Sequence, residues 1–133
     1  MNSKPTILIV DNEEESLELF RNILKEEDYI VLTAGNSKEA LERVETERPK
    51  LVILNLNTSD MNEIKTLRRI KKIDENIEVL MITHYGTMKA ARTAMELGAC
   101  DYVTEPLDND YIRALIKNVF SPVPGRLLQL ELK

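Results

Sequence analysis

The chain is poor in cysteine and aromatic residues and has no long hydrophobic run. Of its 133 residues one is cysteine, none is tryptophan, and aromatic residues make up 5%. The single Cys100 excludes an internal disulfide and suits a reducing compartment, so we expect a cytoplasmic protein. No apolar segment is long enough to span a bilayer, and Met1–Pro5 leads into a strand without the apolar stretch of a signal peptide.

The sequence also lacks a block of basic residues. Eighteen Lys and Arg are scattered among 23 Asp and Glu, which gives a net charge of -5. Nucleic acids are bound through clustered positive charge, so we expect no direct nucleic-acid partner. With 43% hydrophobic and 31% charged residues, the composition is that of a globular domain with a buried core.

Short apolar runs alternate with segments of helical period. The runs that predict strands are Thr6–Val10, Ile30–Ala34, Leu51–Leu54, Glu78–Thr83 and Asp101–Thr104. Between and after them, apolar residues recur three and four positions apart, which predicts amphipathic helices. The third to fifth helices are predicted at Glu63–Ile73, which has a basic outer face, Met88–Leu97 and Asp108–Val119. Asn36 and Glu39 have the spacing of a capping box, and Gly98 is placed to end the fourth helix.

Five such repeats predict an α/β fold of the flavodoxin-like, or CheY-like, class over residues 1–120. The expected architecture is a doubly wound, five-stranded parallel sheet of order 2-1-3-4-5 with five helices. Ligands of these sheets bind at the carboxyl ends of the strands, near the switch point between the first and third. Asp11 and Asn55 end those two strands, and Thr83 and Glu105 belong to the same edge.

Four segments in order resemble the receiver domains of bacterial two-component response regulators. They are Ile7–Glu13, Pro49–Asn55, Met81–Gly86 and Leu97–Pro106, and the resemblance covers about residues 5–120. The stretch from Tyr85 to Pro106 is most similar to receivers of the nitrogen-regulator type. The resemblance implies a signalling domain rather than an enzyme.

In that family an acidic pair holds Mg²⁺, an aspartate accepts the phosphoryl group, and a threonine and a lysine bind it. The resemblance assigns Asp11, Asn12 and Glu13 to the acidic turn, Asn55 to the acceptor position and Glu105 to the lysine position. Thr83 and Tyr102 match the two switch positions. His84 stands where the family has a small residue, and the loop at 57–63 lacks the usual proline and aspartate-glycine pair.

These replacements predict a degenerate site. An amide at Asn55 is no anionic nucleophile, and Asn12 offers Mg²⁺ a neutral oxygen. Two unit charges about 4 Å apart interact by about 4 kcal/mol at an effective dielectric of about 20, so Glu105 opposes an incoming phosphoryl group. We expect no cofactor, and at most weak Mg²⁺ binding at Asp11. Two simpler explanations of these replacements are that Asn55 was engineered and that Glu105 is a solvated residue at the rim of the site. A more specific hypothesis is that His84 and Glu105 form an ion pair that fills the pocket.

The resulting prediction is a pseudo-receiver that acts by protein–protein contacts without phosphorylation. The expected surface is the fourth helix, fifth strand and fifth helix, with contributions from Lys89, Arg92, Tyr111 and Arg113 and with partners that include a second copy. The alternatives are a regulator phosphorylated on another carboxylate and a small-molecule sensor; a hydrolase using Asp11 ranks below them.

The last thirteen residues, 121–133, follow the predicted domain as a separate segment. A Pro- and Gly-containing linker at 121–125 precedes Arg126–Lys133, in which leucines alternate with polar residues. This pattern fits either the start of a following domain or a segment that packs on this domain or another chain.

Overall fold

The computed structural model describes residues 4–25, 27–55, 63–84 and 86–120. Its strands are β1 (Thr6–Val10), β2 (Ile30–Ala34), β3 (Leu51–Leu54), β4 (Glu78–Thr83) and β5 (Asp101–Thr104). Its helices are α1 (Glu14–Leu24), α2 (Ser37–Glu47), α3 (Glu63–Ile73), α4 (Met88–Glu96) and α5 (Asn109–Phe120). The five strands and α3 have their predicted bounds. The segment 121–133 and its predicted roles lie outside the described residues.

Three helix ends differ by one residue from the prediction, one of them the end of the fifth helix, which is Phe120 rather than Val119. The fourth helix ends at Glu96, and Leu97 is its cap. The fifth begins at Asn109, because the Asp108 carboxylate accepts hydrogen bonds from the backbone N–H groups of Asp110 and Tyr111 and so caps the helix. At the start of the second helix, Asn36 Oδ1 accepts a hydrogen bond from the Glu39 N–H at 2.8 Å, as the capping box predicts. Glu39, however, reaches back to the N–H of Gly35, at 2.6 Å.

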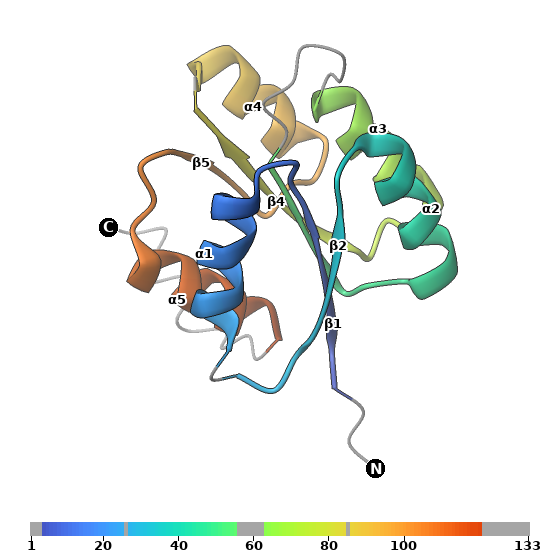
Figure 1. Ribbon diagram of the computed structural model, residues 1–133. Coiled ribbons are helices and arrows are strands. Elements are labelled where there is room, and N and C mark those ends of the chain that lie inside the picture. The colour runs from blue at the N-terminus through green and yellow to red at the C-terminus, as the bar shows by residue number, and fades with distance from the viewer. Residues whose placement is uncertain (1–3, 26, 56–62, 85, 121–133) are drawn as a thin grey trace.

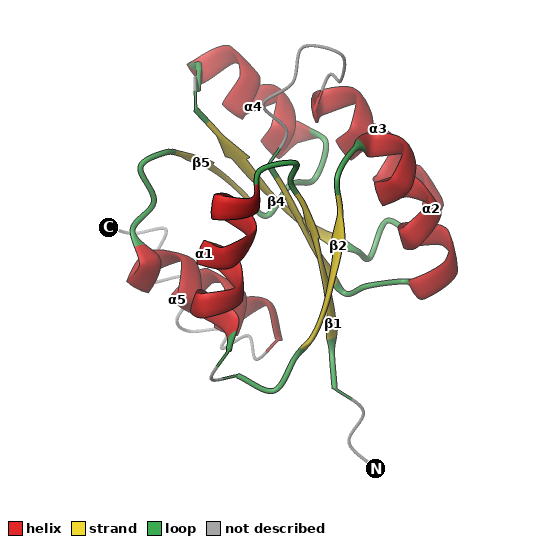
Figure 2. Cartoon of the chain, viewed as in Figure 1, coloured by secondary structure: helices red, strands yellow, loops and turns green. Residues whose placement is uncertain are grey.

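The sheet is parallel throughout, in the order β2-β1-β3-β4-β5. Helices α1 and α5 cover one face and α2, α3 and α4 the other (Figures 1 and 2). Alternate residues of β1 point to opposite faces: Ile7 packs with Phe20 of α1, and Leu8 with Val44 of α2. Burial of each such side chain contributes about 1.5–3 kcal/mol, so two cores hold the sheet rigid between its helices. The doubly wound fold is confirmed.

Candidate functional site

The carboxyl edge of the sheet fixes the backbone of three polar residues. The N–H of Asp11 donates to Ala34 O at 2.9 Å, that of Asn55 to Val10 O at 2.8 Å, and that of Glu105 to Thr83 O at 2.8 Å. Each bond continues the parallel ladder beyond a strand end. The sheet therefore sets where these three side chains start, as the strand order predicted.

The Asn55 amide is buried and joins two carboxylates. Its side chain is fully inaccessible, and Asp11 is 1% exposed. Asn55 Nδ2 donates to Asp11 Oδ2 at 3.0 Å and lies 3.4 Å from Glu105 Oε1, also within hydrogen-bond range. Asp11 Oδ1 accepts from the Glu13 N–H at 2.9 Å. Both oxygens of Asp11 are thus engaged by protein groups.

Burial raises the pKa of the Asp11 carboxyl above its ordinary value. The nearby Glu13 charge adds to the rise, whereas hydrogen bonds from the Glu13 N–H, the Ser16 side chain and Asn55 counteract it. Ser16 was not singled out from the sequence, because its place on the first turn of α1 carries no motif. These hydrogen bonds stabilise the Asp11 carboxylate, but the effect of burial is larger.

His84 closes the site from the end of β4. Its Nδ1 forms a close contact with Glu105 Oε2, and its Nε2 lies 3.9 Å from Glu13 Oε1. The predicted pairing of His84 with Glu105 is confirmed as a contact. Glu105 spans from the imidazole to the Asn55 amide, and its side chain is 19% exposed, which is lower than expected for a solvated rim residue. A continuous polar chain runs from Glu13 through His84, Glu105 and Asn55 to Asp11.

The two switch positions contact each other. Thr83 is buried, and its side chain and the Thr87 backbone hydrogen-bond to the Tyr102 hydroxyl. Burial, and next the charge of Glu63, raise the pKa of Tyr102 despite these bonds. A Cβ on Gly86 would lie 2.5 Å from Thr104 Oγ1 and 3.3 Å from Tyr102 Cε1. Gly86, the last residue of the Met81–Gly86 segment, permits this close approach because it has no Cβ.

The donor set does not fit the Mg²⁺ that the family resemblance implies. Asn12, at the position of the second acid, is exposed and offers only a neutral amide oxygen. Among the described residues, no group of three or more His, Cys, Asp or Glu side chains has the arrangement needed to hold a metal ion. With both Asp11 oxygens already engaged, we derive no metal-dependent step. Residues 56–62 and Tyr85, which belong to the expected loops, lie outside the described residues.

Other expected features have simpler roles. Cys100 is partly buried, and burial raises the pKa of its thiol to about 12, as expected for an unreactive side chain. Glu14 and Glu15 lie in the first turn of α1, where anions are favoured. Within the described ranges, no helix combines the length and apolar character needed to cross a membrane.

Comparison with known proteins gives consistent matches over most of the chain. The family model for the response regulator receiver domain matches residues 7–117. Sporulation initiation phosphotransferase F of Bacillus subtilis (strain 168) is 39% identical over 117 residues, covering 88% of this chain and 93% of that protein. The putative response regulator NtrX-like of Rickettsia bellii (strain RML369-C) is 33% identical over 129 residues, 96% of this chain but only 27% of that protein.

Solved structures agree with the fold. A CheY-like response regulator receiver domain protein from Methanospirillum hungatei JF-1 superposes with a TM-score of 0.80 at 25% identity, covering 88% of this chain and 94% of that one. The signal receiver domain of a putative Luxo repressor protein from Vibrio parahaemolyticus gives 0.84 at 23% identity, covering 96% and 97%. With its family model matched over residues 7–117, this chain belongs to the response regulator receiver domains.

Proposed function

We propose that this domain is a pseudo-receiver, which signals by protein contacts in the cytoplasm without phosphorylation at position 55. The observation that carries the proposal is the buried Asn55 amide, held between Asp11 and Glu105 at the acceptor position. An amide provides no anionic nucleophile for an aspartyl phosphate. The domain then needs no cofactor and catalyses no reaction.

The charges around Asn55 support the same conclusion. Asp11, Glu13 and Glu105 bring three carboxylates to the site, and His84 contacts two of them. Receiver chemistry requires cations at the developing phosphoryl charge. Here the Asn55 amide and the His84 imidazole satisfy the carboxylates instead, so the polar chain takes the place of Mg²⁺, phosphoryl group and lysine.

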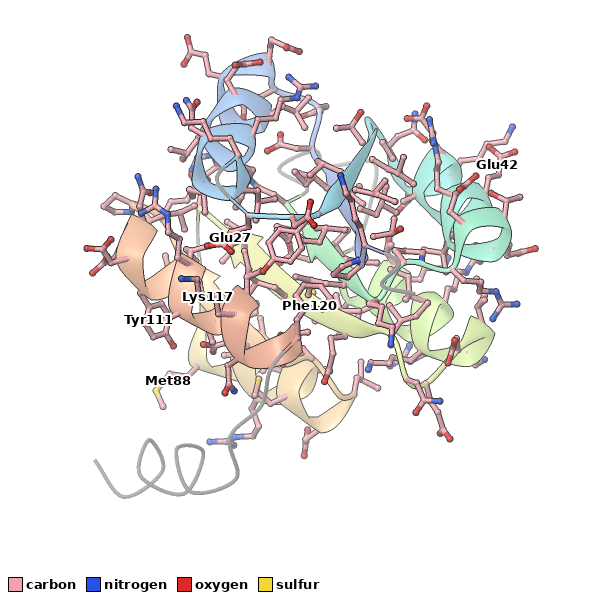
Figure 3. The ribbon with its side chains drawn as sticks, turned by 90° about the horizontal axis from the view of Figure 1, so that it is seen from below. Glu27, Glu42, Met88, Tyr111, Lys117 and Phe120 are labelled. Atoms are coloured by element: carbon pink, nitrogen blue, oxygen red, sulfur yellow. The ribbon has the colours of Figure 1, made fainter. Side chains whose placement is uncertain are left out.

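The output surface that we propose is the face formed by α4, β5 and α5, hereafter the α4–β5–α5 face. Met88 is 81% exposed, and Met95 and Tyr111 are 47% and 48% exposed. Figure 3 shows Met88 and Tyr111 projecting outward on the same side of the molecule. Tyr111 is held to β5 by its hydroxyl, which donates to Asp101 at 2.5 Å. An exposed apolar group of this kind is typical of a protein-binding surface.

The charged residues expected at this face divide into two groups. Lys89 and Arg92 are exposed on α4 and remain candidates for partner contacts. Arg113 instead points to α1, where its Nε donates to Ile23 O at 3.4 Å. Its guanidinium is therefore a structural link between α5 and α1, a role that the helical period alone did not separate from a surface role.

Incubation with acetyl phosphate and Mg²⁺, followed by intact mass, tests the proposal. We expect no added phosphate on the parent protein, and little on Asn55→Asp, because Asn12 and Glu105 remain. The variant Asn12→Asp/Asn55→Asp/Glu105→Lys restores the acid, the acceptor and the cation, and should react at least about 100-fold faster than Asn55→Asp. A parent protein that gains one phosphate would instead support the alternative of another carboxylate acceptor.

A further inference from the structure

Helix α3 carries a concentration of positive charge that the site does not use. Its eleven residues include five basic side chains, Lys65, Arg68, Arg69, Lys71 and Lys72, against one acid, Glu63. The chain as a whole has a net charge of -5, so this helix has the opposite sign. Arg68, Arg69 and Lys72 are exposed. Their spacing of three and four residues places them on one side of the helix.

These three cations are available to a partner. In the part of the chain that the structure describes, no carboxylate forms an ion pair with Arg68, Arg69 or Lys72. Other basic residues are engaged in ion pairs: Arg21 pairs with Glu14 and Glu18, and Lys117 with Glu27. Exposed arginines without a partner can turn their planar donor groups toward incoming carboxylates.

A groove of about 430 Å³ adjoins them, between α3 and the end of α4. Arg68 and Lys72 line it together with Lys71, Leu97 and Gly98. Lys71 is fixed, because its Nζ donates to Ile77 O at 2.6 Å and to Glu75 O at 3.2 Å. Gly98 has φ +99°, and a Cβ there would lie 3.3 Å from Lys71 Cε. The groove thus combines a held ammonium, an apolar contact at Leu97 and two adjustable cations.

We propose that this α3–α4 groove, together with Arg69, binds an acidic segment of a partner protein. Carboxylates at helical spacing would meet Arg68, Arg69 and Lys72, and an apolar side chain would contact Leu97. Exposed ion pairs are individually weak and screened by salt. Several must therefore act together, and their contribution lies in orientation and association rate. The inference does not depend on whether Asn55 blocks phosphorylation.

The surroundings favour a short acidic segment over a long polyanion. Glu75 and Glu96 also line the groove, and α2, which lies beside α3 in Figure 1, exposes Glu42, Glu45 and Glu47. A nucleic acid tracking across α3 would pass these carboxylates and be repelled. A segment that presents one row of acids can avoid them.

A labelled amphipathic peptide, with glutamates at i and i+4 and a leucine on the same face, serves as the probe in fluorescence anisotropy. We compare Arg68→Glu/Arg69→Glu/Lys72→Glu with Lys25→Glu/Lys38→Glu/Lys50→Glu, which reverses three exposed lysines elsewhere and gives the same net charge. The parent should bind with an affinity that falls as salt rises. The first variant should weaken binding at least about tenfold, which is 1.4 kcal/mol, and the second much less.

Three results would overturn the inference. The parent protein fails to bind the peptide at low salt, or both variants weaken binding equally, which reports net charge alone. In the third, duplex DNA of matched charge binds the parent more tightly than the peptide does. Urea unfolding of both variants shows whether each is folded. Arg68→Lys/Arg69→Lys, which retains the charge but loses the planar donor groups, should bind more weakly than the parent and more tightly than the triple glutamate variant.

Discussion

The Asn55 amide makes an attractive contact with the Asp11 carboxylate, and a carboxylate at position 55 would make that contact repulsive. Its Nδ2 donates to Asp11 Oδ2 at 3.0 Å and lies within reach of Glu105 Oε1 at 3.4 Å. Aspartate there would bring a third carboxylate against two others in a buried site, where like charges are costly. The amide at position 55 is therefore electrostatically compatible with Glu105, and a substitution at either position changes the environment of the other.

Gly86 is a second residue whose identity the site requires. We expect Gly86→Ala to destabilise the domain by about 1–3 kcal/mol, because its Cβ would lie 2.5 Å from Thr104 Oγ1 and displace it or Tyr102. Urea unfolding followed by circular dichroism measures the change. A Cβ on Gly35 would meet only Glu39 Oε1 at 3.9 Å, so Gly35→Ala is the matched control. Equal effects of the two substitutions would show that loss of the close approach is not the cause.

At the scale of the element, the first turn of α3 contains an unusual acid. Burial raises the pKa of Glu63 to about 7, and its buried Oε2 has no hydrogen-bond partner among the residues that the structure describes. An anion at a helix N-terminus is ordinarily favoured. At this position the loss of hydration outweighs that benefit, and the Glu63 charge in turn affects Tyr102.

This shift predicts a pH-dependent stability. The folded-state pKa lies above the ordinary value of 4.5, so the fold prefers neutral Glu63, and stability falls as pH rises through about 7. Glu63→Gln removes the ionisation and should be more stable than the parent by about 1–3 kcal/mol at pH 8, with little difference at pH 4.5.

Urea unfolding at the two pH values measures this difference. Glu42→Gln removes a carboxylate that projects from α2 (Figure 3) and should give the same small effect at both. A stabilisation by Glu63→Gln that is as large at pH 4.5 as at pH 8 would contradict the ionisation argument.

The elements themselves were predictable because their signals are local. The five strands follow from apolar runs. Asn36 caps the second helix through its side chain, and Gly98 follows the fourth helix with a positive φ. The pairing of His84 with Glu105 could be predicted from the sequence because neighbouring strands bring the two residues to one edge of the sheet. The roles of Ser16, Glu63 and Arg113 were not, since each depends on what another element brings within reach. The helical periodicity of the sequence predicts which face of its helix such a side chain lies on, but not which residue of another element it contacts.

At the scale of the whole molecule, charge and apolar surface are separated. Acids gather on α1 and α2 and cations on α3. Of the four large exposed hydrophobic side chains among the described residues, three lie on α4 and α5. The fourth, Ile30, lies on β2 at the other edge of the sheet. The α4–β5–α5 face and the α3–α4 groove can therefore serve different partners without competing for the same side chains.

The exposed Met88 and Met95 of the α4–β5–α5 face predict that two copies of the domain pair around a twofold axis through this face. We expect sedimentation velocity to show self-association that increases with protein concentration, and Met88→Glu/Met95→Glu to abolish it. Both methionines are exposed, so the substitutions should change the free energy of unfolding by no more than about 0.5 kcal/mol each. Ile30→Glu, at an exposed apolar residue outside the face, should leave association unchanged. Self-association that survives the methionine substitutions would assign the contact to another surface, and a parent protein that stays monomeric would contradict the prediction.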